Sequence, residues 1–349
     1  MMNILRAPCF LFLCAMLLLP IALPGVAQDL LPTEPRAFHR WLVDSRIAMA
    51  KARVITGATP EARLQYKGNM EDSNVLLLYA CGYAGEWSKY YHDADLLQKS
   101  TLLLDDLSTL YLDPAWRAKS CAGLDPFFDL HTFSLAVYLW QETGAVAKEK
   151  TVRWISAVRA MADNALAMNT GPLAGDYANP EFYMLSGLAV TAKLTGEERY
   201  RREAAECLRR FADDFYPDGG MSYFMDSNPQ IGYQGMITSS TALYYEMTGD
   251  PLAKEMLARI ARYYCQSLHP LGFQPPYESP VLKQNWNYPF FNPADVRLAA
   301  VMSEDPEASW MAGVVEQRYR EGLQGRWPSF LSGKYKEAYW QNYHSAKSS

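Results

Sequence analysis

The residues best suited to chemistry lie between predicted helices, and the richest stretch is YPDGGMSYFMDSNPQIGYQG, residues 216–235. It holds four aromatic side chains, two aspartates, four glycines and two prolines. A plain connection between packed helices needs only about 2 to 8 residues. This stretch is longer and more varied, so we predict that it carries function, with Tyr233, Asn228 and Gln234 as candidate site residues and Asp218 in an Asp-Gly-Gly turn.

Further long links have a similar composition, rich in Tyr, Trp, Asn, Asp and Glu, at residues 67–74, 113–131, 169–183 and 269–293. Flat aromatic faces suit sugar rings, and amides and carboxylates bond hydroxyl groups. The links therefore predict a rim that binds a polysaccharide or oligosaccharide. Its expected contacts are Tyr177, Tyr223, Trp286 and Tyr288 for stacking, and Asn228, Gln234, Lys283 and Asp218 for polar contacts.

A repeat of about fifty residues must position these links. Segments 127–166, 181–215 and 233–268 share an apolar helix, a Thr-Gly turn and a charged amphipathic helix. The turns begin at Thr143, Thr195 and Thr248, which gives spacings of 52 and 53 residues. Glycine after a helix is the expected stop, because it adopts the left-handed conformation without a Cβ penalty. The first helix of each copy should be buried and the second half-exposed.

Less regular copies at 74–112 and 290–323, with a helix near 35–54, bring the count to about 10 to 12 helices. We predict an all-α fold, a closed (α/α) toroid of five or six hairpins. Residues 28–349 would form this single domain. The short turns would lie on one face. The long links would meet on the other face, where the inner helices begin and offer free N–H groups to anions.

The first 27 residues have the order of a secretory signal peptide: Arg6, an apolar run, two prolines and small residues before a cleavage point after Ala27. We expect an exported protein, periplasmic or extracellular, with no membrane association after cleavage. The chain has 33 basic and 38 acidic residues, which does not suit nucleic-acid binding. It has no Walker or Rossmann glycine motif and no metal-ligand spacing, so we expect no cofactor and no metal.

The hairpin repeat and the segment DGGMSYFMDSNPQIGYQG resemble the (α/α) toroid polysaccharide lyases, including the hyaluronate, chondroitin and alginate lyase types. The resemblance covers most of the mature chain at the level of layout. It implies cleavage of a uronate-containing polysaccharide by β-elimination. Tyr233 matches the tyrosine of the Gly-Tyr element, whereas His131 and Asn179 are assigned from their position in the links.

This chemistry removes the C5 proton of a uronate and expels the sugar linked at C4, so it needs a base, an acid and donors to the carboxylate. The resemblance implies that Tyr233 is the acid, or both acid and base. His131 is the base candidate, since its unperturbed pKa is about 6.5. Asn179, Asn228 and Gln234 are the expected donors to the carboxylate, with Lys283 or Arg117 as a charge partner.

Two other functions fit the same residues. A glycoside hydrolase of the toroid type, similar to unsaturated glucuronyl hydrolases, needs two carboxylates across the scissile bond. Its candidates include Glu181 and Asp129 at inner-helix starts, together with Asp125, Asp176, Asp218, Asp226 and Glu278. A glycan-binding protein without catalysis would need the aromatic rim alone.

Overall fold

Helical hairpins make up the part of the protein that the computed structural model describes, which is residues 31–52, 57–64, 70–120, 125–168, 178–221, 231–272 and 293–323. These residues form helices joined by turns, and their only β-type pairing is a single bridge between Phe215 and Met221. The predicted all-α class is confirmed for this part of the chain. The predicted signal peptide lies outside the described residues.

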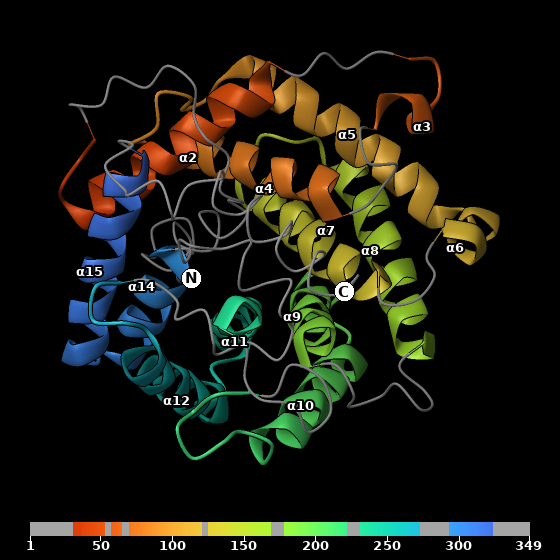
Figure 1. Cartoon of the computed structure of the whole chain (residues 1–349). Coiled ribbons are helices and arrows are strands. Elements are labelled where there is room, and N and C mark those ends of the chain that lie inside the picture. Colours follow the sequence, from red (N-terminus) through yellow and green to blue (C-terminus); the bar gives the residue numbers. More distant parts are fainter. Residues whose placement is uncertain are drawn as a thin grey trace, which may run out of the picture.

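Two kinds of helix alternate along the chain, as the repeat predicts (Figure 1). The inner helices are α4 (Met70–Ala84), α7 (Asp125–Glu142), α9 (Ala178–Thr195), α11 (Ile231–Thr248) and α14 (Pro293–Ser303). The outer helices are α5 (Ala94–Leu112), α8 (Lys148–Met168), α10 (Glu198–Ala212), α12 (Pro251–Ser267) and α15 (Pro306–Leu323). Helix α2 (Pro35–Lys51) precedes them, and α3 (Pro60–Arg63) and α6 (Pro114–Ser120) are short.

The turns inside the hairpins have one design. Gly144, Gly196 and Gly249 follow α7, α9 and α11 with φ of 66°, 72° and 70°, the left-handed conformation expected at a helix stop. The preceding threonine caps each turn: Thr195 Oγ1 accepts from Glu197 N at 3.2 Å, and Thr248 Oγ1 accepts from Asp250 N at 3.2 Å. The Thr-Gly turns are therefore confirmed.

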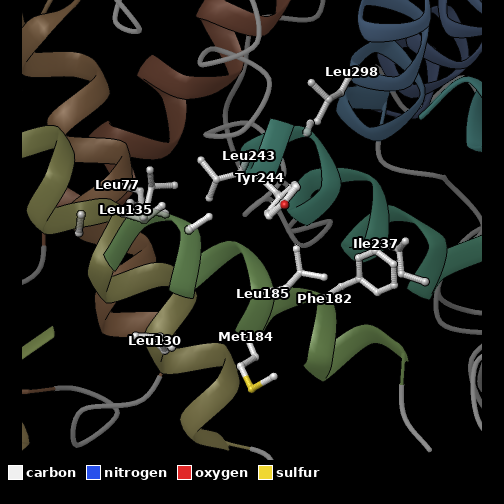
Figure 2. Close-up of a cluster of buried hydrophobic side chains, with 14 of the residues drawn as sticks. Leu77, Leu130, Leu135, Phe182, Met184, Leu185, Ile237, Leu243, Tyr244 and Leu298 are labelled. Atoms are coloured by element: carbon white, nitrogen blue, oxygen red, sulfur yellow. The ribbon is translucent and has the colours of Figure 1, made fainter. Parts of the chain in front are cut away.

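The hydrophobic core lies where neighbouring inner helices meet and where outer helices cover them. In sequence order, α4 packs on α7, α7 on α9, α9 on α11 and α11 on α14, while α2 packs on α4. Leucines and aromatics from α4, α7, α9, α11 and α14 fill these interfaces, as Figure 2 shows for Leu77, Leu130, Phe182, Ile237 and Leu298. This packing holds the N-terminal halves of the inner helices in fixed positions relative to one another.

A buried ion cluster connects the beginning of the described chain with its end. His39 of α2 contacts Glu316 of α15, with 3.0 Å between Nε2 and Oε1. Arg297 of α14 donates to both oxygens of the same carboxylate, at 2.6 and 2.7 Å. Burial opposes ionisation of Glu316, but the bonds from His39 and Arg297 outweigh it and lower its pKa. We call these three residues the end-helix ion cluster.

Two further findings concern the cysteines and the apolar character of the helices. Cys81 of α4 is disulfide-bonded, and its partner lies outside the described residues, whereas Cys207 and Cys265 are free. Within the described ranges, no helix is both long and apolar enough to cross a membrane.

Candidate functional site

Polar side chains gather inside the N-terminal halves of four neighbouring inner helices. They are His131 on α7, Tyr183 and Ser186 on α9, Ser239 on α11 and Asp295 on α14, and we call them the inner polar cluster. Burying a polar group costs free energy unless it is hydrogen-bonded. If every group has a hydrogen-bond partner, the cluster is a structural network. If some donors or acceptors have none, they can bond a ligand.

His131 is almost fully buried, with 3% of its surface exposed. Its Nδ1 lies 2.7 Å from Ser186 Oγ. The Ser186 hydroxyl donates back to the backbone of its own helix, with the carbonyl oxygens of Phe182 and Tyr183 each 3.0 Å away. A serine hydroxyl has one proton; we assign it to the backbone bond, so that Ser186 accepts from His131 and Nδ1 carries the hydrogen. The Nε2 lone pair is then left as an acceptor, and it bonds no described residue.

The charge state of His131 follows from its surroundings. Burial lowers the pKa of His131 from 6.5 to about 3, because the buried site disfavours the imidazolium. The ring is therefore neutral from pH 5 to 8. A neutral imidazole with a free Nε2 is the form that accepts a proton.

Among the described residues, the ring of Tyr183 contacts that of His131, with 4.4 Å between the ring centroids. The Ser239 side chain is close enough to the Tyr183 hydroxyl to favour its ionised form, which by itself would lower the pKa of Tyr183. Ser239 donates to the carbonyl oxygen of Met236 at 2.9 Å. Burial, and then the nearby charge of Asp295, raise the pKa of Tyr183, which keeps the phenol protonated.

Two half-buried aromatic side chains adjoin the buried histidine. They are Tyr183 on α9, which contacts His131, and Phe128 on α7, which contacts Tyr183. Phe128 meets Tyr183 edge to face, with 5.2 Å between centroids. Phe128 and Tyr183 thus keep part of their aromatic surface accessible close to His131, which suits a flat sugar ring.

The inner polar cluster follows the repeat of the sequence. His131, Tyr183 and Met236 are separated by 52 and 53 residues, the spacing of the Thr-Gly turns. Ser134, Ser186 and Ser239 come three residues later, and each donates to the carbonyl of that residue, at 3.3, 3.0 and 2.9 Å. Equivalent positions on successive helices therefore carry the polar groups of the cluster, and the serine bonds the same backbone position in each helix.

Glycines allow the inner helices to approach closely beside the cluster. A Cβ on Gly187 would lie 3.0 Å from the backbone nitrogen of His131, and one on Gly235 would lie 2.2 Å from Asp295 Oδ2. A side chain at either position would push two inner helices apart. The two glycines thus fix the distance from α9 to α7 and from α11 to the Asp295 carboxyl.

Asp295 is 6% exposed. Its Oδ1 has no hydrogen-bond partner among the described residues. Burial raises its pKa well above the usual value, because a carboxylate is poorly stabilised there. Burial thus favours the neutral acid of Asp295, and no described residue bonds its Oδ1.

The structure places several predicted site residues in other roles. Gln234 is fully buried, and its Oε1 accepts from Met221 N at 3.0 Å, which ties α11 to the Asp-Gly-Gly turn. Asp218 caps that turn by accepting from Gly220 N at 2.9 Å, as its turn chemistry predicts. Glu181 is buried and faces the outer layer, where Arg210 Nη2 of α10 lies 3.3 Å from its Oε2.

Of the remaining predicted residues, Tyr233 and Asn179 lie in the first turns of α11 and α9, and Arg117 donates to the carbonyl oxygen of Tyr111. Asp129 is buried on α7, and Asp125 begins that helix. The other predicted positions fall outside the described residues: Tyr177, Tyr223, Asn228, Lys283, Trp286 and Tyr288 of the predicted rim, and Asp176, Asp226 and Glu278 of the carboxylate candidates.

Sequence reasoning missed Tyr183, Ser186, Ser239 and Asp295. A signal for them exists, because each is a polar residue inside an apolar inner helix, and three of them recur at the repeat spacing. Among the described residues, no group of His, Cys, Asp and Glu side chains is arranged to hold a metal ion.

Two comparisons with known proteins identify no family for this chain. A scan against models of protein families finds no match, and a search of curated proteins finds no significant match either.

Proposed function

We propose that the protein is an exported carbohydrate-active enzyme that cleaves a uronate-containing polysaccharide by β-elimination on an (α/α) toroid. The order of helix contacts supports the toroid, because five inner helices pack in sequence order and α2 meets α15 through the end-helix ion cluster. Export is supported by the N-terminal signal pattern and by the disulfide at Cys81, since disulfides persist mainly in oxidising compartments.

The observation that carries the reaction is the free Nε2 of neutral His131 beside Tyr183. In the proposed step, Nε2 takes the C5 proton of the uronate. The electron pair of that C–H bond forms the C4=C5 double bond as the bond from C4 to the bridging oxygen breaks. The Tyr183 hydroxyl gives its proton to that leaving oxygen, and the high pKa of Tyr183 keeps the proton in place until then.

An anionic substrate improves this base. A carboxylate beside His131 favours the imidazolium and so raises the low pKa of the empty site. A neutral sugar would leave the imidazole a weak base. The burial of His131 therefore favours a uronate over a neutral polysaccharide.

The acid role is assigned to Tyr183 because its ring contacts His131, whereas the sequence assigns it to Tyr233. Tyr183→Phe and Tyr233→Phe separate the two assignments. We expect Tyr183→Phe to lower turnover by about 10²-fold or more, since general acid catalysis contributes about 10² to 10⁴. Tyr233→Phe should keep most of the activity, and the opposite result would return the role to Tyr233.

The proposed function is tested with the mature chain and a panel of hyaluronan, chondroitin, alginate and polygalacturonate. β-Elimination alone makes an unsaturated uronate, which absorbs ultraviolet light, whereas hydrolysis makes new reducing ends without that absorbance. We expect both signals to rise together on one of the polymers. Reducing ends without absorbance would establish the hydrolase alternative, and binding without either signal would establish a glycan-binding protein.

A further inference from the structure

Asp295 is held in an unusual setting for a carboxyl group. Its Oδ2 lies so close to α11 that a Cβ on Gly235 would be only 2.2 Å away. Its Oδ1 is buried and has no hydrogen-bond partner among the described residues. A buried polar atom without a partner costs about 1 to 3 kcal/mol. A bound group that pairs with Oδ1 would recover that free energy.

The described groups around Asp295 leave it without a counter-charge. Helix α14 packs on α11, α12 and α15. An ionised Asp295 would raise the pKa of Tyr264 on α12 and of Tyr183 on α9, and both of these groups are hydroxyls without a positive charge. Arg297, two residues along the same helix, is engaged with both oxygens of Glu316 on α15. In these surroundings the buried carboxyl is stable as the neutral acid, whose O–H is a hydrogen-bond donor.

We propose that Asp295 receives the carboxylate of the substrate's uronate, donating its O–H to one carboxylate oxygen. This inference rests on the proposed function. An O–H donor to a carboxylate forms a short, charge-assisted hydrogen bond. Withdrawing charge from the uronate carboxylate also stabilises the enolate-like state that forms when the C5 proton leaves.

The proposed role of Asp295 completes a set of three functional groups. The Tyr183 ring contacts His131, and a charge on Asp295 would raise the pKa of Tyr183, so Asp295 is within electrostatic reach of Tyr183. The base, the acid and the carboxylate receptor thus come from α7, α9 and α14, and each is held by inner-helix packing. The site selects a sugar acid, because a neutral hexose offers no carboxylate to Asp295.

The test measures binding without turnover, using His131→Asn as the parent variant. Tetrasaccharides of hyaluronan, chondroitin and alginate are compared by calorimetry with their carboxyl-reduced counterparts. In this parent we expect Asp295→Leu to weaken binding of the acidic tetrasaccharide by about 10- to 100-fold, since hydrogen bonds to charged groups contribute about 1.5 to 3 kcal/mol. Asp295→Asn keeps a donor and should bind nearly as tightly as the parent.

A pH series separates this role from a structural one. In the parent variant, affinity for the acidic tetrasaccharide should fall as rising pH removes the proton of Asp295. In Asp295→Asn this fall should disappear, because the amide donor does not titrate. The inference is overturned if folded Asp295→Leu binds the acidic ligand as tightly as the parent, or if Asp295→Asn keeps the same pH dependence.

The two proposals fail separately. Binding of the acidic tetrasaccharide that depends on Asp295, without any cleavage by the unmutated protein, would refute the lyase function and leave the Asp295 inference standing. Cleavage whose KM is the same in folded Asp295→Leu would support the lyase function and overturn the Asp295 inference.

Discussion

The inner polar cluster and the end-helix ion cluster are both buried and polar, yet their hydrogen bonds differ. In the end-helix ion cluster, one carboxylate is shared by His39 and by two nitrogens of Arg297. In the inner polar cluster, Nε2 of His131 and Oδ1 of Asp295 bond no described residue. The Glu316 carboxylate is bonded on both oxygens and connects helices, whereas the two acceptors without a described partner leave the inner polar cluster capacity for a ligand. Activity and stability should therefore respond to different mutations.

The largest effect is expected at His131. In His131→Asn, the amide can keep the bond to Ser186, but the base at Nε2 is gone. We expect turnover to fall by about 10² to 10⁴-fold, the contribution of a general base. The melting temperature should change little. The assay is formation of unsaturated product on the polymer that the protein cleaves. Unchanged turnover in the folded variant would remove His131 from the mechanism.

The second-largest effect is expected for mutation of Glu316, and it is an effect on folding stability. Glu316→Leu leaves Arg297 without its buried carboxylate, which should cost about 3 to 5 kcal/mol of unfolding free energy. Turnover per folded molecule should stay the same, because Glu316 is outside the inner polar cluster. Denaturant unfolding, with activity measured on the folded fraction, checks both results. A loss of turnover in Glu316→Leu with normal stability would contradict the assignment of stability to the end-helix ion cluster and of activity to the inner polar cluster.

The same carboxylate gives a pH dependence. The pKa of Glu316 is lowered in the folded protein, so its stabilisation is present above the unfolded pKa of about 4.3. It is lost as pH falls through the lower folded value. The stability gap between the unmutated protein and Glu316→Leu should therefore shrink in acid, which unfolding curves at several pH values would show.

Asp295 should change the folding stability with pH in the opposite direction to Glu316. Its folded pKa is raised, so its protonated form stabilises the fold below the unfolded pKa of about 3.9, and this contribution is lost as pH rises. The Asp295→Asn variant has no carboxyl at this position, so it does not lose this stabilisation as pH rises. The unfolding free energy of Asp295→Asn, relative to that of the unmutated protein, should therefore grow by about 1.4 kcal/mol per pH unit until the folded pKa of Asp295 is reached. A constant difference across pH would show that Asp295 is ionised as usual.

The smallest effect is expected for an exposed ion pair on α10, which serves as a control for both clusters. Glu198 and Arg201 are bonded at the surface of the outer layer. Exposed pairs contribute little, because water already solvates both charges. Glu198→Ala should leave the melting temperature and turnover unchanged. A marked shift in either would mean that the assays do not isolate buried interactions.

The sequence predicted the layout well, because periodicity and turn chemistry are local. The spacing of Thr143, Thr195 and Thr248 located three hairpin turns, and the apolar runs located the buried helices. Asp218 was recognised as a turn residue for the same reason. These features depend on residues within a few positions of each other.

The site was predicted less well, because its bonds join residues about 55 positions apart. His131 was selected, but its partner Ser186 and its neighbour Tyr183 lie on the next inner helix. Asp295 resembled a first-turn residue of a helix, and only the contact with Gly235 shows its buried setting. Gln234 was expected to bind substrate, yet it bonds the backbone of Met221. Such pairings require the three-dimensional packing of neighbouring helices.

The central claim is that His131 is a neutral base with its proton on Nδ1, and nitrogen NMR of the labelled mature chain tests it most directly. Burial and the bond to Ser186 predict an unprotonated Nε2, a protonated Nδ1 and no titration of His131 between pH 5 and 8. The same spectrum of Ser186→Ala, which lacks the Ser186 hydroxyl, shows whether the bond to Ser186 is what holds the proton on Nδ1. A protonated Nε2, or titration near the ordinary pKa of about 6.5, would contradict the account.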